Sequence, residues 1–210
     1  MILRTTAALL ALTPAVALAE TASITDVTGR VVEVDVPVER VILGEGRQVY
    51  FTAVLDRASP FERIVGWRDD MSKADPETYA AYLEKFPEIA GLPTFGGMKD
   101  GTFDVEQAAS LSPDVVLMNV DAKAATEEAG YTETLAKLGI PVVYVDFRED
   151  AMKNTEPSLR VMGQLLGKEA EAEDFIGWRA EQMARVTDVI AAENPARPVV
   201  FVERAGGYSD

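Results

Sequence analysis

The spacing of apolar residues predicts a chain in which strands and helices alternate. Residues 24–37 alternate apolar and polar positions around a turn at Thr28, Gly29 and Arg30, a pattern that predicts a β-hairpin. Four further short runs rich in apolar residues predict strands, and the uninterrupted run at residues 115–118 is typical of a parallel strand covered on both faces. These runs occupy residues 41–44, 61–67, 115–118 and 140–147.

Helix signals lie between these runs. Asp75 and Asp104 are typical N-cap residues, and each is followed by apolar residues at helical spacing. Pro113 ends the helix that begins after Asp104. Strands and helices that alternate in this way between residues 41 and 147 predict one α/β domain. The helices predicted for this domain cover about residues 47–56, 76–86, 105–112 and 124–138.

Two more helices and one more strand follow this domain. The helices are predicted over residues 155–166 and about 170–192. Residues 199–202 predict a strand that opens a new α/β unit, yet no helix follows it. We therefore expect a fragment or truncated form of a two-lobed protein. The second helix carries the apolar residues Phe175, Ile176, Met183, Val186 and Ile190.

The first nineteen residues have the pattern of a cleavable secretory signal. Arg4 precedes an apolar middle, and the small residues Ala17 and Ala19 lie before Glu20. The apolar run is short for a membrane anchor and contains Pro14. The sequence has no cysteine that could carry a lipid or form a disulfide. We expect a soluble periplasmic protein that is neither lipidated nor inserted into a membrane.

The composition excludes several function classes. The 210 residues include 20 Lys and Arg and 35 Asp and Glu, so the formal net charge is −15 at pH 7. Such a charge repels nucleic acid and anionic lipid. The sequence has no histidine, which removes imidazole metal ligands and Ser-His catalytic triads. We expect no nucleic-acid partner, no resident metal ion and no cofactor.

Cationic residues follow the predicted strands. Ligands of open α/β sheets bind beyond the carboxyl ends of the strands, where these cations would meet. Guanidinium groups suit oxygen-rich anions, and Arg47 also lies near a helix N-terminus. Tyr50, Trp67 and Tyr208 supply rings that can stack on a flat chelate. The strand-end cations are Arg47, Arg68, Lys99, Lys123, Arg148 and Arg204.

Four segments together carry a family resemblance. They are DVTGRVVEVDVPVERVI at 26–42, IVGW at 64–67, FGGMKDGTFDVEQAASLSPDVVLM at 95–118 and LGIPVVYVDF at 138–147. In order and spacing they resemble the periplasmic binding proteins of iron–siderophore ABC importers, over about residues 24–202. The resemblance implies two α/β lobes joined by a single long helix, with only the start of the second lobe present. The implied parts are a signal peptide at 1–19, an N-terminal lobe at 20–148, a linking helix at 149–168 and a truncated C-terminal lobe at 169–210.

The resemblance also implies a function, that of a monomeric binding protein and not an enzyme. Such a protein captures a ferric-siderophore-like complex between its lobes and delivers it to an ABC transporter permease in the inner membrane. In this family a glutamate at the start of the helix before the Pro-Asp strand docks on arginines of the permease, and Glu106 has that position. The candidate ligand-binding residues are Arg47, Tyr50, Trp67, Arg68, Lys99, Asn119, Arg204 and Tyr208.

Other functions stay open. Haem or cobalamin are alternative chelates; the lack of histidine disfavours a His-ligated haem, but Tyr50 or Tyr208 could ligate its iron. The hairpin resembles the siderophore branch more than the cobalamin branch. A secreted α/β enzyme would need a GxSxG, GxGxxG or P-loop motif, and the sequence has none of them. A structural interaction module would leave the strand-end cations without a role.

Overall fold

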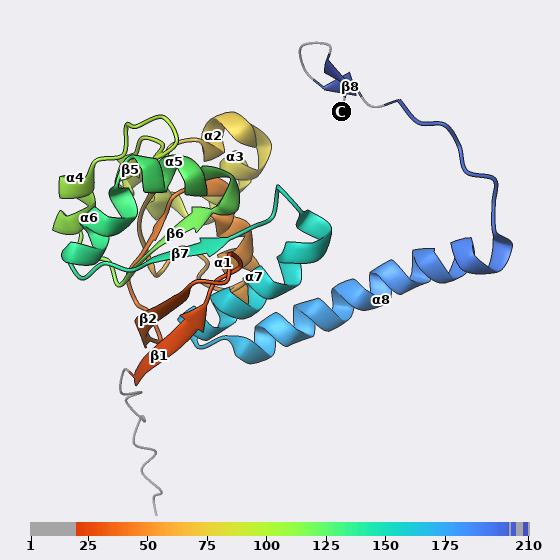
Figure 1. The fold of residues 1–210 in the computed structure, drawn as a ribbon, viewed down its shortest axis with the longest axis horizontal. Helices are drawn as coiled ribbons and strands as arrows, with labels where there is room; N and C mark the ends of the chain where they lie inside the picture. The colour runs from red at the N-terminus through yellow and green to blue at the C-terminus, as the bar shows by residue number, and fades with distance from the viewer. Residues whose placement is uncertain (1–19, 202, 205–207, 210) are drawn as a thin grey trace, which may run out of the picture.

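A five-stranded parallel sheet forms the centre of the protein (Figure 1). The computed structural model describes residues 20–201, 203, 204, 208 and 209. The strand order is β5-β4-β3-β6-β7, with each neighbouring pair parallel, so the predicted α/β class is confirmed. The strands are β3 (Val41–Leu43), β4 (Ile64–Arg68), β5 (Thr94–Phe95), β6 (Val115–Asn119) and β7 (Val142–Val145).

Both faces of this sheet are buried, as the uninterrupted apolar runs predict. In β6, Val115 and Leu117 join one core cluster, whereas Val116 and Met118 join the other. Because side chains alternate between the two faces of a strand, a strand covered on both sides must be apolar at every position. The two clusters therefore lie on opposite faces of the sheet.

Helices form the two layers that cover the sheet (Figure 1). The first layer contains α1 (Val49–Leu55), α3 (Pro76–Lys85) and α7 (Ala151–Leu166), and the second contains α4 (Val105–Ser110), α5 (Lys123–Glu128) and α6 (Tyr131–Lys137). The short helix α2 (Met71–Ala74) and the 3-10 turns η1 (Gly46–Gln48), η2 (Pro87–Gly91) and η3 (Val120–Ala122) lie in the connections.

The local signals for the helices are mostly confirmed. Asp75 and Asp104 cap α3 and α4 by accepting hydrogen bonds from backbone N–H groups three residues later. The predicted helix at 124–138 is instead two helices, because Gly130 between them has a φ of +70°. Helix α7 begins at Ala151, earlier than predicted, because Asp150 is its N-cap.

The predicted hairpin is present and is fastened to the edge of the sheet. It consists of β1 (Glu20–Thr25) and β2 (Val31–Val36), which pair antiparallel. In its turn, the Arg30 side chain donates to the Val142 carbonyl at 3.3 Å, and the buried Asp26 accepts from the Tyr144 N–H at 3.3 Å. The hairpin thereby satisfies part of the backbone of β7, an edge strand.

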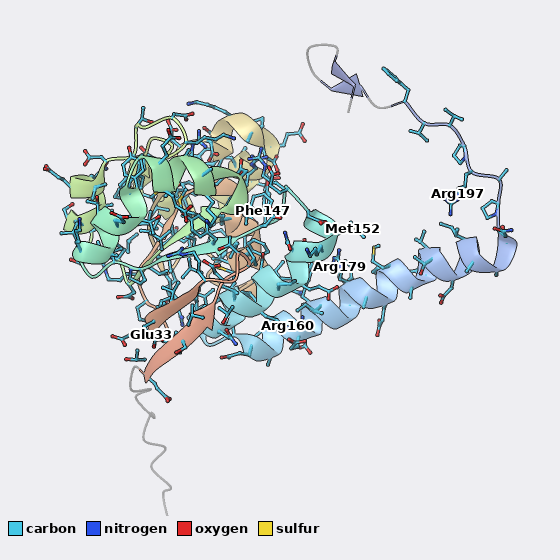
Figure 2. The ribbon with its side chains drawn as sticks, viewed as in Figure 1. Glu33, Phe147, Met152, Arg160, Arg179 and Arg197 are labelled. Atoms are coloured by element: carbon cyan, nitrogen blue, oxygen red, sulfur yellow. The ribbon has the colours of Figure 1, made fainter. Side chains whose placement is uncertain are left out.

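Helix α8 (Glu169–Glu193) packs on the lobe only over its first half (Figure 1). Ala172 and Ile176 are buried there. Two ion pairs also join it to α7, from Arg160 to Glu173 at 2.6 Å and from Arg179 to Glu156 at 2.8 Å (Figure 2). Beyond them the helix leaves the lobe.

The apolar residues in the second half of α8 are exposed. Met183, Val186 and Ile190 are 37%, 58% and 53% exposed, although they continue the apolar stripe of the first half. The lobe ends before it reaches them, so burial of this apolar stripe would need a second packing partner.

The strand predicted at residues 199–202 is also not found. Residues 199–201 have no regular structure and are exposed, and residue 202 lies outside the described part of the chain. A strand needs a neighbour that takes its backbone hydrogen bonds. The two short strands that follow, β8 (Glu203–Arg204) and β9 (Tyr208–Ser209), pair with each other. The predicted signal at residues 1–19 lies outside the described residues, and within them no helix is long and apolar enough to cross a membrane.

The close packing of β3 against β6 gives a test of the fold. A Cβ added at Gly44 would collide with the Met118 sulfur and lie 2.6 Å from the Leu117 carbonyl oxygen. We predict that Gly44→Ala lowers the free energy of unfolding by about 1–3 kcal/mol, measured by urea denaturation. The control is Gly177→Ala, at an open helical position, which should raise stability by about 0.5–1 kcal/mol. Equal stability of Gly44→Ala and the unsubstituted protein would contradict this packing.

Candidate functional site

The loops after the parallel strands bring their polar side chains to one edge of the sheet. Because all five strands run in the same direction, their carboxyl ends lie together. Ion pairs join the loops: Arg148 after β7 reaches Glu45 after β3 at 3.0 Å, and Lys99 after β5 lies 3.8 Å from Asp121 after β6. This carboxyl edge is the candidate ligand site.

Glu45 lies at the centre of the carboxyl edge. It is 4% exposed, and its Oε2 accepts hydrogen bonds from Arg148 Nη1 and from the Asn119 amide. Its Oε1 lies against the Arg47 guanidinium. Gln48 donates to Asn119 Oδ1 and accepts from the Glu45 N–H, each at 3.2 Å. A buried carboxylate is thus held between two arginines and two amide side chains.

The two arginines that contact Glu45 face solvent on their other side. The side chains of Arg47 and Arg148 are 26% and 40% exposed. Burial alone would lower the pKa of the Arg148 guanidinium, but attraction to Glu45 and the hydrogen bond that Arg148 donates to Glu45 outweigh burial and raise the pKa. A guanidinium has five N–H donors, so both groups keep donors for another acceptor.

Arg68 is held at the same edge by two further acids. It contacts Asp100 at 2.9 Å and Asp70 at 3.8 Å, and Asp70 also accepts the Gly46 N–H at 2.8 Å. A Cβ at Gly97 would lie 2.9 Å from the Arg68 guanidinium, so a glycine lets the loop after β5 approach this side chain. Arg68 is therefore fixed from two loops and remains 29% exposed.

Each strand-end cation with a described side chain is paired with an acid, which was not expected. Lys123 completes the set by contacting Glu127 at 2.7 Å. The open row of positive charge expected at the strand ends is therefore corrected to a row of ion pairs with a balanced formal charge. The carboxyl edge can still donate hydrogen bonds, but it gives little long-range attraction for an anion.

The aromatic candidates do not form a ligand-facing wall. Trp67 is 3% exposed and packs edge-on against Phe61 in the core, because its strand is covered on both faces. Tyr50 is half-buried and donates a 2.5 Å hydrogen bond to Asp75. Burial and this contact raise the pKa of the Tyr50 phenol, and the hydrogen bond from Tyr50 is the main cause that lowers the pKa of the Asp75 carboxyl. As placed, Trp67 is a core residue and Tyr50 lies aside from the Glu45 cluster.

The remaining candidates divide into three cases. Asn119 is 2% exposed and holds Glu45, so it lies behind the ligand-facing surface. Arg204 and Tyr208 occupy β8 and β9, but their side chains lie outside what the structure describes. Glu106 is exposed in the first turn of α4, as predicted, and its docking role stays a prediction.

The carboxyl edge forms one wall of a site and not a closed pocket. The cavity between Glu45, Arg68 and Lys99 measures only about 20 Å³, whereas small-molecule pockets span roughly 300–1,000 Å³. An open groove of about 670 Å³ lies at the opposite end of α1, between Asp56 and α8. The charged contacts just described lie at the carboxyl edge and not in that groove. Within the described ranges, no three acidic side chains are grouped to hold a metal ion.

Asp146 fixes the loop that carries Arg148. It is fully buried, and its Oδ1 accepts the Arg148 and Glu149 N–H groups at 2.8 and 2.9 Å. Its Oδ2 accepts the Asp150 N–H at 3.0 Å and the Asn154 amide at 2.7 Å. Burial alone would raise the pKa of this carboxyl, but the four hydrogen bonds outweigh burial and lower it.

Two residues of the site were not among the sequence candidates. Glu45 could have been singled out as an acid between two glycines directly after a strand, at a position where the cations were expected. Arg148 is one of the strand-end cations, but the candidate ligand set does not include it. Long-range pairing between the two was not visible in the sequence, because 103 positions separate them.

Comparison with known families identifies the chain. Residues 77–209 match the family described as periplasmic binding protein. The chain belongs to the periplasmic binding protein family. This is a family of binding proteins and not of enzymes. A comparison with curated proteins found no match.

Solved structures of periplasmic binding proteins share this fold. The TroA-like periplasmic binding protein FepB from Veillonella parvula is 29% identical with a TM-score of 0.77, over 86% of this chain and 52% of that one. The siderophore binding protein BauB, bound to ferric iron with two acinetobactin molecules, is 20% identical with a TM-score of 0.62, over 89% and 60%. MolA of Haemophilus influenzae, bound to molybdate, is 20% identical with a TM-score of 0.56, over 73% and 48%. The chain spans about half the length of these structures.

The lowered pKa of Asp146 predicts that the stability of this binding protein depends on pH. Its contribution to stability is complete above the ordinary Asp pKa of about 3.9 and is lost as the pH falls through the lower pKa of the folded state. Asp146→Asn should therefore lower the free energy of unfolding by about 1–3 kcal/mol at pH 7, and by much less near pH 2. Urea denaturation at both pH values measures the difference.

The matched control is Glu149→Gln, an exposed neighbour that should change stability little at either pH. A destabilisation of Asp146→Asn that is equally large at both pH values would show that the charge of Asp146 is not the cause.

Proposed function

We propose that the chain is the solute-binding component of an ABC importer and that it captures a ferric-siderophore-like complex. The observation that supports this most directly is the convergence of Arg47, Arg68 and Arg148 at the carboxyl edge, each partly exposed and held by an acid. Fixed guanidinium groups suit an oxygen-rich anionic chelate, because they donate several hydrogen bonds in a defined geometry. The bound ferric complex in BauB, a protein of the same fold, agrees with this ligand class.

A second lobe would supply the opposite wall of the site. The carboxyl edge alone encloses almost no volume, and the chain spans about half of its solved relatives. We propose that α8, and not residues 149–168, is the helix that joins the lobes. Helix α7 belongs to the core of the N-terminal lobe, whereas α8 leaves it with exposed apolar residues.

The location and partners are part of the same proposal. Export through the signal at residues 1–19, without a lipid, would deliver a monomer to the periplasm. There the ligand would pass to a permease in the inner membrane, with Glu106 on α4 as a docking residue. Haem and cobalamin remain alternative ligands.

A ligand panel tests the proposed function. Intrinsic fluorescence of Trp67 and Trp178 is followed while ferric siderophores, haem, cobalamin and molybdate are titrated into the protein. We expect saturable quenching by an anionic ferric siderophore, and a loss of affinity of about tenfold in Arg68→Gln. Arg57→Gln, an exposed arginine beside the groove at the far end of α1, is the control and should bind normally. Binding of none of the ferric siderophores would exclude the proposed ligand class.

The docking role of Glu106 has a separate test. Glu106→Ala should leave ligand affinity intact, because the side chain is exposed on α4, but it should reduce uptake of iron by cells that depend on this protein. Glu77→Ala, another exposed first-turn glutamate, is the control. Uptake that is unchanged in Glu106→Ala would reject the docking role.

A further inference from the structure

Glu45 lies too deep in the carboxyl edge to contact a ligand, yet both of its oxygens meet residues that can. We propose that Glu45 is a positioning residue, which holds the guanidinium groups of Arg47 and Arg148 as one fixed pair of donors facing the ligand. This proposal rests on the proposed ligand site at the same edge and names the residue that organises it.

The burial of Glu45 needs an explanation. Removing a carboxylate from water is costly unless its oxygens find partners. Oε2 has two, Arg148 and Asn119, whereas Oε1 lies against Arg47 without forming a hydrogen bond. A neutral side chain of similar size would fit the space with a smaller desolvation cost. The site therefore requires the negative charge of Glu45. This charge attracts the guanidinium groups of Arg47 and Arg148.

Arg47 and Arg148 need a shared partner to lie together. They come from loops after β3 and β7, which are not neighbouring strands, and two like charges repel each other. Glu45 contacts both of them, one through each carboxylate oxygen. Asp121 is a weaker partner, 3.9 Å from Arg148. Without the carboxylate, the two long side chains would separate and sample many rotamers.

The support beneath Glu45 is rigid enough to transmit its position. The Gly44 N–H donates to the Leu117 carbonyl at 2.8 Å, and the Gly46 N–H donates to Asp70 at 2.8 Å, so the backbone is fixed on both sides of Glu45. Gln48 and Asn119 are 0% and 2% exposed, and their side-chain amides form hydrogen bonds with Glu45 on its buried side. The arginines therefore rest on a carboxylate that has little freedom to move.

The charge of the cluster suggests the probe ligands. Glu45, Arg47 and Arg148 together carry one formal positive charge, which Asp121 beside Arg148 balances, and the two guanidinium groups keep several free donors toward solvent. An iron(III) complex of a hexadentate tris-catecholate carries three negative charges, whereas the iron(III) complex of a tris-hydroxamate is neutral. Dependence on Glu45 should be strong for the first complex and weak for the second.

A first experiment tests the positioning without any ligand. Nitrogen–proton NMR spectra of the arginine side chains, assigned with Arg47→Lys and Arg148→Lys, report whether each guanidinium is restrained. We expect restrained signals for both arginines in the unsubstituted chain and averaged signals in Glu45→Gln. Glu127→Gln, which removes an ion pair of Lys123 at the same edge, should leave both signals unchanged. Restrained signals in Glu45→Gln would overturn the proposal.

If Glu45→Gln does not fold, Glu45→Met replaces it. This change removes the carboxylate and its desolvation cost but keeps a side chain of similar size. The same averaging of the Arg47 and Arg148 signals is expected. Signals that stay restrained in a folded Glu45→Met protein would equally contradict the positioning role.

A second experiment measures affinity for the two iron complexes. Glu45→Gln should weaken binding of the tris-catecholate about tenfold or more, but by less than about twofold when Arg47 and Arg148 are already replaced by Gln. A loss of the same size in both backgrounds, or tighter binding by Glu45→Gln, would overturn the proposal. If the unsubstituted chain binds neither complex, the proposed function fails, and the ligand-free spectra still decide whether Glu45 holds the arginines.

Discussion

The structure depends on the burial of both faces of a parallel sheet. In β6 every residue is buried, and alternate side chains enter the two core clusters. Polar side chains therefore collect at the last residues of the strands, as Arg68 and Asn119 do, and in the loops that follow. Because the strands are parallel, the loops that follow their carboxyl ends all lie at one edge of the sheet. The fold alone therefore creates the carboxyl edge, whatever the ligand.

A second constraint, charge balance, decides the character of that edge. The chain carries a formal charge of −15, and the loops that supply cations also supply Glu45, Asp70, Asp100, Asp121 and Glu127. The cations can still donate hydrogen bonds to a ligand when they are paired with these acids. The acids fix the direction of long, flexible side chains, so the edge presents ordered donors instead of a diffuse positive field. Selectivity of such a surface would come from geometry at short range.

The sequence predicted the parts of the fold that depend on local patterns. Continuous apolar runs marked the strands, and Asp75 and Asp104 marked helix starts at positions that the structure confirms. The exposure of the second half of α8 was not predicted, because periodicity shows which face of a helix is apolar but not where its packing partner ends. Gly130 divides one predicted helix into two. The sequence did not show this break, because the residues on both sides of Gly130 have a helical pattern.

The candidate site was predicted less well, because its contacts join distant residues. The sequence placed Arg47, Arg68 and Lys99 at the correct edge, but it could not pair them with acids from other loops. It also treated Trp67 as a ligand-facing ring, although the residue lies on a strand that is covered on both faces. The choice of partner in an ion pair and the burial of a side chain both depend on the tertiary structure. A single sequence contains no signal for either.

The carboxyl edge is the surface that we propose binds the ligand. Anomalous X-ray diffraction at the iron absorption edge, from crystals grown with an iron(III) tris-catecholate complex, locates the metal without assumptions about the chelate. We expect one iron peak beside Arg68 and Arg148. A peak in the groove between Asp56 and α8, with none at the carboxyl edge, would contradict this proposal.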